Sequence, residues 1–91
     1  MTEQEFQRRI AGSELPAMLE KLGFSAAFVA DKVLSAPGPV SVSQIAMLWM
    51  GMPNKHDRKR VRQLFEALER RRMVERVDEA GETFAVPADQ R

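Results

Sequence analysis

The 91-residue chain has no cysteine, no tyrosine and a single histidine, His56. Without cysteine it can form no disulfide, no thiolate nucleophile and no cysteine-based zinc site. His56 stands among lysines and arginines, where solvation or contact with a phosphate is favoured over metal ligation or catalysis. Because the other residues offer no group of base, nucleophile and orienting partner, we expect no enzymatic activity and no cofactor.

Long apolar runs are also lacking. The longest wholly non-polar run, IAMLWMGMP at residues 45–53, is far shorter than the roughly 20 residues that span a bilayer. The first twelve residues, MTEQEFQRRIAG, lack the apolar core of a secretory signal. Hydrophobic residues make up 44% and charged residues 30%, a globular balance. We therefore expect one small cytoplasmic domain.

The net charge of +1 conceals an uneven distribution. Residues 1–53 carry four cations and five anions, and residues 77–91 carry one cation and four anions. Residues 54–76, in contrast, carry nine cations and four anions. A basic block between a near-neutral half and an acidic end is the electrostatic pattern of a phosphate-binding surface.

The first half predicts three helices in one N-terminal unit, residues 1–36, which belongs to the same domain as the rest. The first helix covers residues 3–11 and stops at Gly12. Ser13 is the expected cap of the second helix, which Gly23 ends, and Ser25 is the expected cap of the third. The prolines and glycine of SAPGP, residues 35–39, force a turn.

The second half predicts a strand, two helices and a hairpin. Val40 is a candidate for a very short strand, and Ser41 with Gln44 matches a capping box for a helix that continues to about Met50. Asp57, rather than Asn54, is the favoured start of the next helix, over residues 57–73. Its apolar positions have helical spacing: Val61, Leu64, Phe65 and Leu68. MVERVD, the turn EAGE and TFAVP read as a β-hairpin, which Pro87 limits to an edge or a terminus.

Several residues in this half carry a resemblance to a known family. They are Val40, Ser41, Val42, Ser43, Gln44, Ile45, Ala46, Leu48, Gly51, Met52, Val61, Phe65, Leu68, Met73, Val74, Glu75 and Arg76. Over residues 40–87 the chain thus resembles the winged helix-turn-helix superfamily. The resemblance implies a mostly α fold with a small β-hairpin and an N-terminal helical extension. The turn from Gly51 to Val61 is longer than the family's, and the wing tip, residues 78–82, carries three carboxylates.

The resemblance also implies that the basic helix enters the major groove of double-stranded DNA, as in a small transcriptional regulator. Gln63 and Glu66 would then contact bases, with adenine and cytosine as their partners. The expected DNA-binding residues are Lys55, Arg58, Lys59, Arg60, Arg62, Gln63 and Glu66.

Two other interpretations of this basic helix stay open. The charges can form i, i+4 pairs on a solvated face, since Glu66 lies four residues from both Arg62 and Arg70. Alternatively, the same fold can serve as a protein–protein adaptor or inhibitor.

The helix that precedes the basic helix contains the stretch IAMLWMGM, residues 45–52, which has no polar residue. Ile45, Leu48, Trp49 and Met52 share one face, which we expect to fill the core, whereas Met47 and Met50 point nearly the opposite way. Two explanations fit these methionines: the N-terminal helices cover them, or they form a subunit interface, most simply that of a homodimer.

Overall fold

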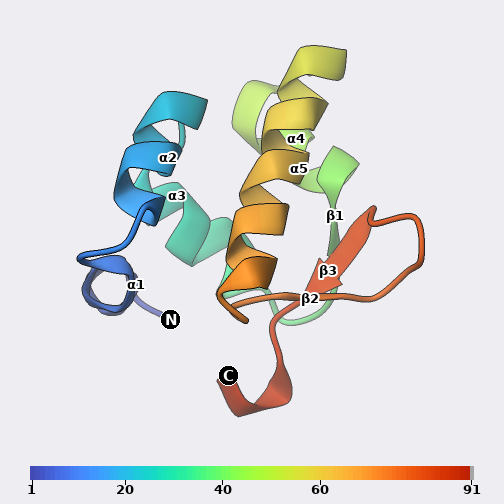
Figure 1. Cartoon of the computed structure of the whole chain (residues 1–91). Coiled ribbons are helices and arrows are strands. Elements are labelled where there is room, and N and C mark those ends of the chain that lie inside the picture. Colours follow the sequence, from blue (N-terminus) through green and yellow to red (C-terminus); the bar gives the residue numbers. More distant parts are fainter. Residues whose placement is uncertain (91) are drawn as a thin grey trace.

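The computed structural model describes residues 1–90 and is mostly helical, with one small antiparallel sheet (Figure 1). In chain order the elements are α1 (Glu3–Ile10), α2 (Leu15–Leu22), α3 (Ala26–Phe28), the π-helical turn η1 (Val29–Val33), β1 (Val40–Ser41), α4 (Val42–Met50), α5 (Lys55–Arg70), β2 (Glu75–Arg76), β3 (Thr83–Ala85) and the 3-10 turn η2 (Ala88–Gln90). The prediction of a mostly α-helical chain with a hairpin near its C-terminal end is confirmed.

Local signals set most helix ends in the first half. Thr2 and Ser25 accept hydrogen bonds from backbone N–H groups at the starts of α1 and α3. Gly23 ends α2 in the left-handed conformation, at φ 92°. The prediction for Ser13 is wrong by one position. Glu14 occupies the N-cap of α2. Ser13, one position earlier, accepts a hydrogen bond from the Leu15 N–H through its side-chain oxygen.

The third predicted helix is short and changes type. After one turn of α-helix, α3 widens into η1, where the Leu34 N–H donates to the Val29 carbonyl five residues earlier, at 3.0 Å. Val29 and Val33 are buried, while Phe28 is only partly buried.

The start of α5 corrects the sequence prediction. Asn54, and not Asp57, is the N-cap, and its side chain accepts the Asp57 N–H at 2.9 Å. Asp57 completes a capping box by accepting the Asn54 N–H at 3.0 Å. The helix therefore covers Lys55–Arg70 rather than residues 57–73, and the turn after α4 is short, from Gly51 to Asn54. The long turn expected from the sequence is absent because the basic residues are already helical.

The hairpin belongs to a three-stranded sheet of order β1-β3-β2. Val40 pairs with Phe84 on one side of β3, and Arg76 pairs with the same residue on the other side. The central strand ends at Ala85, so Pro87 lies beyond the ladder, as predicted for a terminus. Gly81 turns the hairpin at φ 72°, a left-handed conformation that favours glycine, and the guanidinium of Arg76 would lie 3.0 Å from an added Cβ.

One hydrophobic core joins the N-terminal helices to the second half. Phe65 of α5 stacks on Phe84 of β3 with ring centroids 4.6 Å apart, which fixes the sheet against the helix. Phe24, after α2, stacks on Trp49 of α4 with ring centroids 4.2 Å apart, which fixes the N-terminal helices against α4. The two pairs thus join the sheet to α5 and the N-terminal helices to α4.

Candidate nucleic-acid interface

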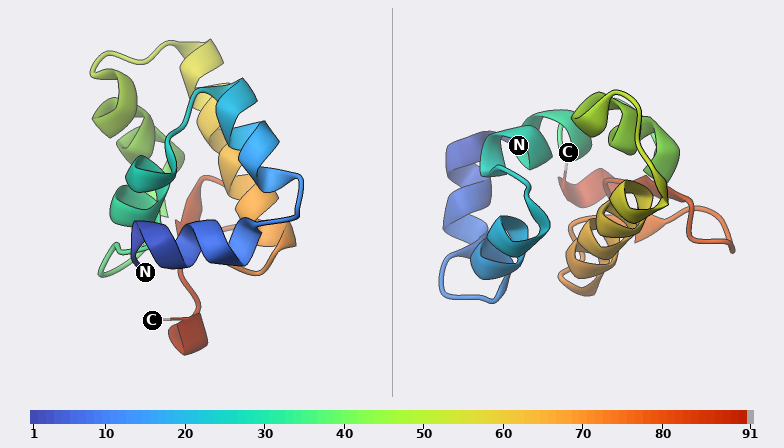
Figure 2. Two further views of the ribbon diagram at one scale, coloured as in Figure 1. Left: turned by 90° about the vertical axis from the view of Figure 1, so that its left-hand side faces the viewer. Right: turned by 90° about the horizontal axis from the view of Figure 1, so that it is seen from above.

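The basic helix α5 lies along one face of the molecule, with α2 on one flank and the hairpin on the other (Figures 1 and 2). Val61, Leu64, Phe65 and Leu68 of α5 are fully buried, as the sequence predicted. Because these positions fix one side of the helix to the core, the polar residues of α5 other than the buried Asp57 are exposed or partly exposed.

Three cations of the predicted site are exposed: Lys55, Lys59 and Arg60. None of them lies within 4 Å of a carboxylate among residues 1–90, so their charges are not neutralised by the chain itself. Lys55 and Lys59 line a shallow hollow of about 550 Å³ together with His56, Arg62, Gln63 and Glu66. Six of the nine positions from Lys55 to Gln63 are basic or histidine, so this half of α5 is the most cationic surface of the helix.

Arg58 and Arg62 are positioned differently from the other predicted contacts. The guanidinium of Arg58 is half-buried and donates to the Pro53 carbonyl at 3.2 Å, which holds the turn between α4 and α5. Arg62 forms an ion pair with Glu82, the last residue of the wing tip before β3. Neither side chain extends freely into solvent, so the cations predicted for this helix do not form one uniform group.

Gln63 and Glu66, the predicted base-reading residues, lie in the middle of the helix. Gln63 is exposed and Glu66 is partly exposed. Glu66 makes no ion pair with Arg62 or Arg70 within 4 Å among the described residues. The i, i+4 pairing that would have explained the charge as a solvated, self-neutralised face is therefore not formed at this residue.

The acidic wing has a structural role for two of its three carboxylates. Glu82 holds Arg62, as described above. Asp78 accepts the backbone N–H groups of Glu82 at 2.9 Å and of Thr83 at 3.1 Å. The bond from Thr83 is the main cause that lowers the pKa of Asp78 below its ordinary value, with the bond from Glu82 in support and partial desolvation opposing them. Glu79 remains exposed, so the wing tip keeps its negative charge.

The methionine-rich end of α4 contradicts the predicted core assignment. Leu48 and Met52, expected in the core, are 57% and 94% exposed. Met47 and Met50 are exposed as well, so the N-terminal helices do not cover this side. On the predicted core face, Ile45 is fully buried and Trp49 is partly buried against Phe24. We call Met47, Leu48, Met50 and Met52 the methionine patch.

Two cations near the predicted site residues were not predicted from the sequence. Lys21 of α2 and Arg70 of α5 line a groove beside Gln63, and neither is among the DNA-binding residues expected from the sequence. No local pattern identifies Lys21, because its position relative to α5 depends on how two distant helices pack.

Among residues 1–90 no three His, Asp or Glu side chains are grouped so that they could hold a metal ion. In the same part of the chain, every helix is too short or too polar to cross a bilayer. Comparison of the chain with protein-family models, with curated proteins and with solved structures gives no match.

Proposed function

We propose that this protein binds double-stranded DNA through α5 and acts as a small transcriptional regulator with a winged helix-turn-helix architecture. The observation that carries the proposal is the set of exposed cations Lys55, Lys59 and Arg60, which have no carboxylate within 4 Å in the described chain. Uncompensated cations on one helical face are what a phosphate backbone requires.

The order of the elements supports this architecture. A strand, two helices joined by a short turn and a hairpin follow one another, and the strand pairs with the hairpin in the order β1-β3-β2. This arrangement resembles the winged helix-turn-helix superfamily. In helix-turn-helix proteins the second helix of the motif lies in the major groove and contacts bases with its N-terminal residues. In this chain that helix is α5, and its N-terminal half is the cationic one.

The structure supports different roles for the side chains of α5. Lys55, Lys59 and Arg60 reach phosphates and set the position of the helix without reading sequence. Gln63, which is exposed one turn further on, pairs with an adenine edge, and Glu66 accepts from cytosine. Arg58 and Arg62 add positive potential but stay engaged with Pro53 and Glu82.

A titration of a fluorescein-labelled 20-base-pair duplex, followed by anisotropy at 50 and 200 mM salt, tests the proposal. We expect saturable binding at the lower salt concentration and a steep loss of affinity at the higher one, because phosphate contacts release counterions. Lys59→Ala should weaken binding to all sequences alike. Arg8→Ala, which removes the same charge from an exposed site on α1, serves as the control. Absence of binding at both salt concentrations would exclude the proposal.

The methionine patch favours a second candidate function, that of a protein–protein adaptor or inhibitor on the same fold. Four large apolar side chains exposed within six residues are unusual on a monomer of this size and mark a contact surface. Methionine suits such surfaces because its side chain is flexible and polarizable. This candidate predicts negligible duplex binding at both salt concentrations, so the same titration separates the two functions. The patch is also compatible with DNA binding, as the interface of a homodimer.

A further inference from the structure

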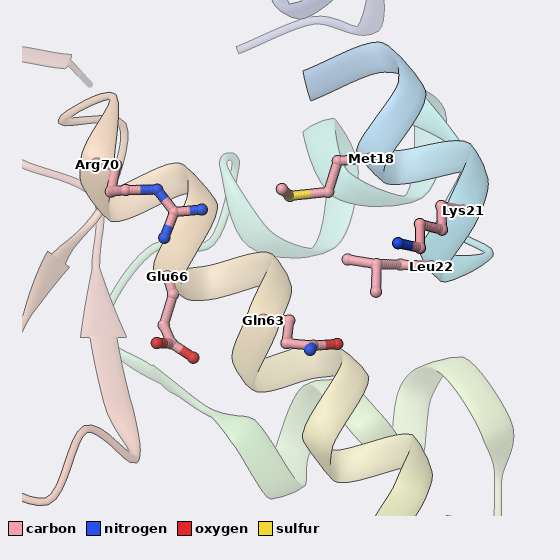
Figure 3. Close-up of a pocket in the computed structure, with 6 residues that line it drawn as sticks. All are labelled: Met18, Lys21, Leu22, Gln63, Glu66 and Arg70. Atoms are coloured by element: carbon pink, nitrogen blue, oxygen red, sulfur yellow. The ribbon is translucent and has the colours of Figure 1, made fainter. Parts of the chain in front are cut away.

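A groove of about 350 Å³ separates α2 from α5, and residues of both helices line it. Figure 3 shows Met18, Lys21 and Leu22 extending from α2 toward α5, while Gln63 and Arg70 extend from α5 toward α2. Glu66 also lines the groove, and its carboxylate is directed away from α2 in this view. The groove thus has an apolar side at Met18 and Leu22 and cations near both ends.

The cations of this groove are available to a ligand. Lys21 and Arg70 are exposed, and neither lies within 4 Å of a carboxylate among the described residues. They come from different helices and carry the same charge, so neither can neutralise the other. The single carboxylate of the lining, Glu66, leaves the groove with a net positive charge.

The groove continues into the cationic hollow at the N-terminal half of α5. Gln63 and Glu66 line both. Together they form a track from Lys55 to Arg70, which at the rise of an α-helix is about 22 Å long. A single small anion would occupy a fraction of this length, whereas a polyanionic strand can follow all of it.

The two flanks of α5 differ in charge. On the hairpin side, Glu82 already holds Arg62, and Glu79 is an exposed carboxylate that repels phosphate. On the α2 side, Lys21 and Arg70 attract phosphate. A helix lying in a major groove has a sugar–phosphate strand on each side of it. The flank that carries cations attracts its strand and the flank that carries carboxylates repels its strand, so the α2 side makes the closer contact with the phosphates.

We propose that the groove between α2 and α5 seats one sugar–phosphate strand of the duplex, with Lys21 and Arg70 as phosphate contacts and the apolar side chains of Met18 and Leu22 against the sugars. The N-terminal helix α2 thereby takes the backbone contact that the acidic wing cannot make. This inference rests on the proposed function, since it assigns the second backbone contact of the same DNA complex.

The test measures the salt dependence of duplex binding for wild type, Lys21→Ala, Lys21→Arg and Arg70→Ala, with Arg8→Ala on α1 as the matched control for charge. Each lost phosphate contact should reduce the slope of log K against log salt by about 0.9. The factor by which affinity falls between 50 and 200 mM salt should therefore be about threefold smaller for Lys21→Ala than for wild type. Lys21→Arg should retain the wild-type slope. Circular dichroism of each variant verifies that the helices are intact.

The outcomes separate the two proposals. A reduced slope in Lys21→Ala and Arg70→Ala, but not in Arg8→Ala, supports the groove as the strand's seat. If the wild-type chain binds the duplex and the salt slope of Lys21→Ala equals that of Arg8→Ala, this inference is overturned and the proposed function stays intact. If the wild-type chain does not bind the duplex at all, both proposals are wrong.

Discussion

Arg62 and Lys59 lie three residues apart on α5 but have different electrostatic surroundings. The Arg62 guanidinium is paired with Glu82, whereas Lys59 is exposed with no carboxylate within 4 Å in the described chain. The ion pair is more than a third exposed on both sides, so it contributes little to stability and can open at low cost. Under the proposed function its consequence is to remove one cation from the surface that would contact DNA.

Glu82→Gln should therefore strengthen duplex binding. The substitution releases Arg62 for a phosphate, which adds about 0.9 to the salt slope. Glu79→Gln is the matched control, because it removes the same charge from the wing without freeing a cation. An anisotropy titration at several salt concentrations compares the two variants. Equal slopes for Glu82→Gln and Glu79→Gln would show that Arg62 stays out of contact with DNA even when it is unpaired.

The backbone hydrogen bonds that Asp78 accepts predict a contribution to stability that depends on pH. Its pKa is lowered in the folded protein, chiefly by the Thr83 N–H, so the charged carboxylate stabilises the fold above its unfolded pKa of about 4. This contribution is lost as the pH falls through the lower, folded pKa. We expect wild type to be more stable than Asp78→Asn at pH 7 and the difference to vanish at about pH 2. Urea denaturation at both pH values measures it, and a pH-independent difference would contradict the assignment.

The helices show which parts of the fold local sequence determines. The capping box of Ser41 and Gln44, the glycine stop at Gly23 and the helix end at Met50 were predicted and are present, because each depends on residues within one turn. The start of α5 was misplaced, because Asn54 and Asp57 are both good caps and form one reciprocal motif. From the sequence alone, either residue can be the first.

Tertiary features could not be predicted in the same way. Helical periodicity placed Leu48 and Trp49 together on the core side of α4, but burial also requires a neighbour. Phe24 supplies one for Trp49, and Leu48 remains 57% exposed. The Arg62–Glu82 pair joins residues twenty positions apart, and the groove joins α2 to α5. The candidate DNA-binding residues were therefore identifiable as a basic helix, but not their partners.

Removal of the α5 cap should destabilise the whole chain. Asn54→Ala loses the bond to the Asp57 N–H and is expected to lower the free energy of unfolding by about 1 kcal/mol. Asn54→Asp retains a side-chain acceptor at the cap and should stay close to wild type. Urea denaturation followed by circular dichroism compares the three proteins. If Asn54→Ala and Asn54→Asp denature at the same midpoint, the cap does not contribute as described.

The molecule as a whole has a cationic face along α5 and an apolar surface at the methionine patch. The patch is uncharged in itself, so two copies can meet there without bringing their patch residues into charge repulsion. A dimer would place two copies of α5 on one duplex, which raises affinity through linked binding. Helix-turn-helix dimers commonly use this arrangement to bind two half-sites.

We therefore expect the wild-type chain to sediment as a dimer at micromolar concentration. A double variant, Met47→Glu with Met50→Glu, should be monomeric, because apposed carboxylates cannot be buried. Arg8→Glu, with a new carboxylate outside the patch, controls for the added charge. A wild-type chain that sediments as a monomer would remove the patch as a dimer interface.

Chemical-shift mapping on the ¹⁵N-labelled chain, titrated with a 20-base-pair duplex, tests the central claim most directly. The claim is that the exposed cations of α5 contact the DNA backbone. It predicts salt-sensitive shifts in the backbone amides of residues 55–66, with smaller shifts in the wing. A spectrum that does not change with duplex at low salt, or changes confined to α1 and the methionine patch, would contradict it.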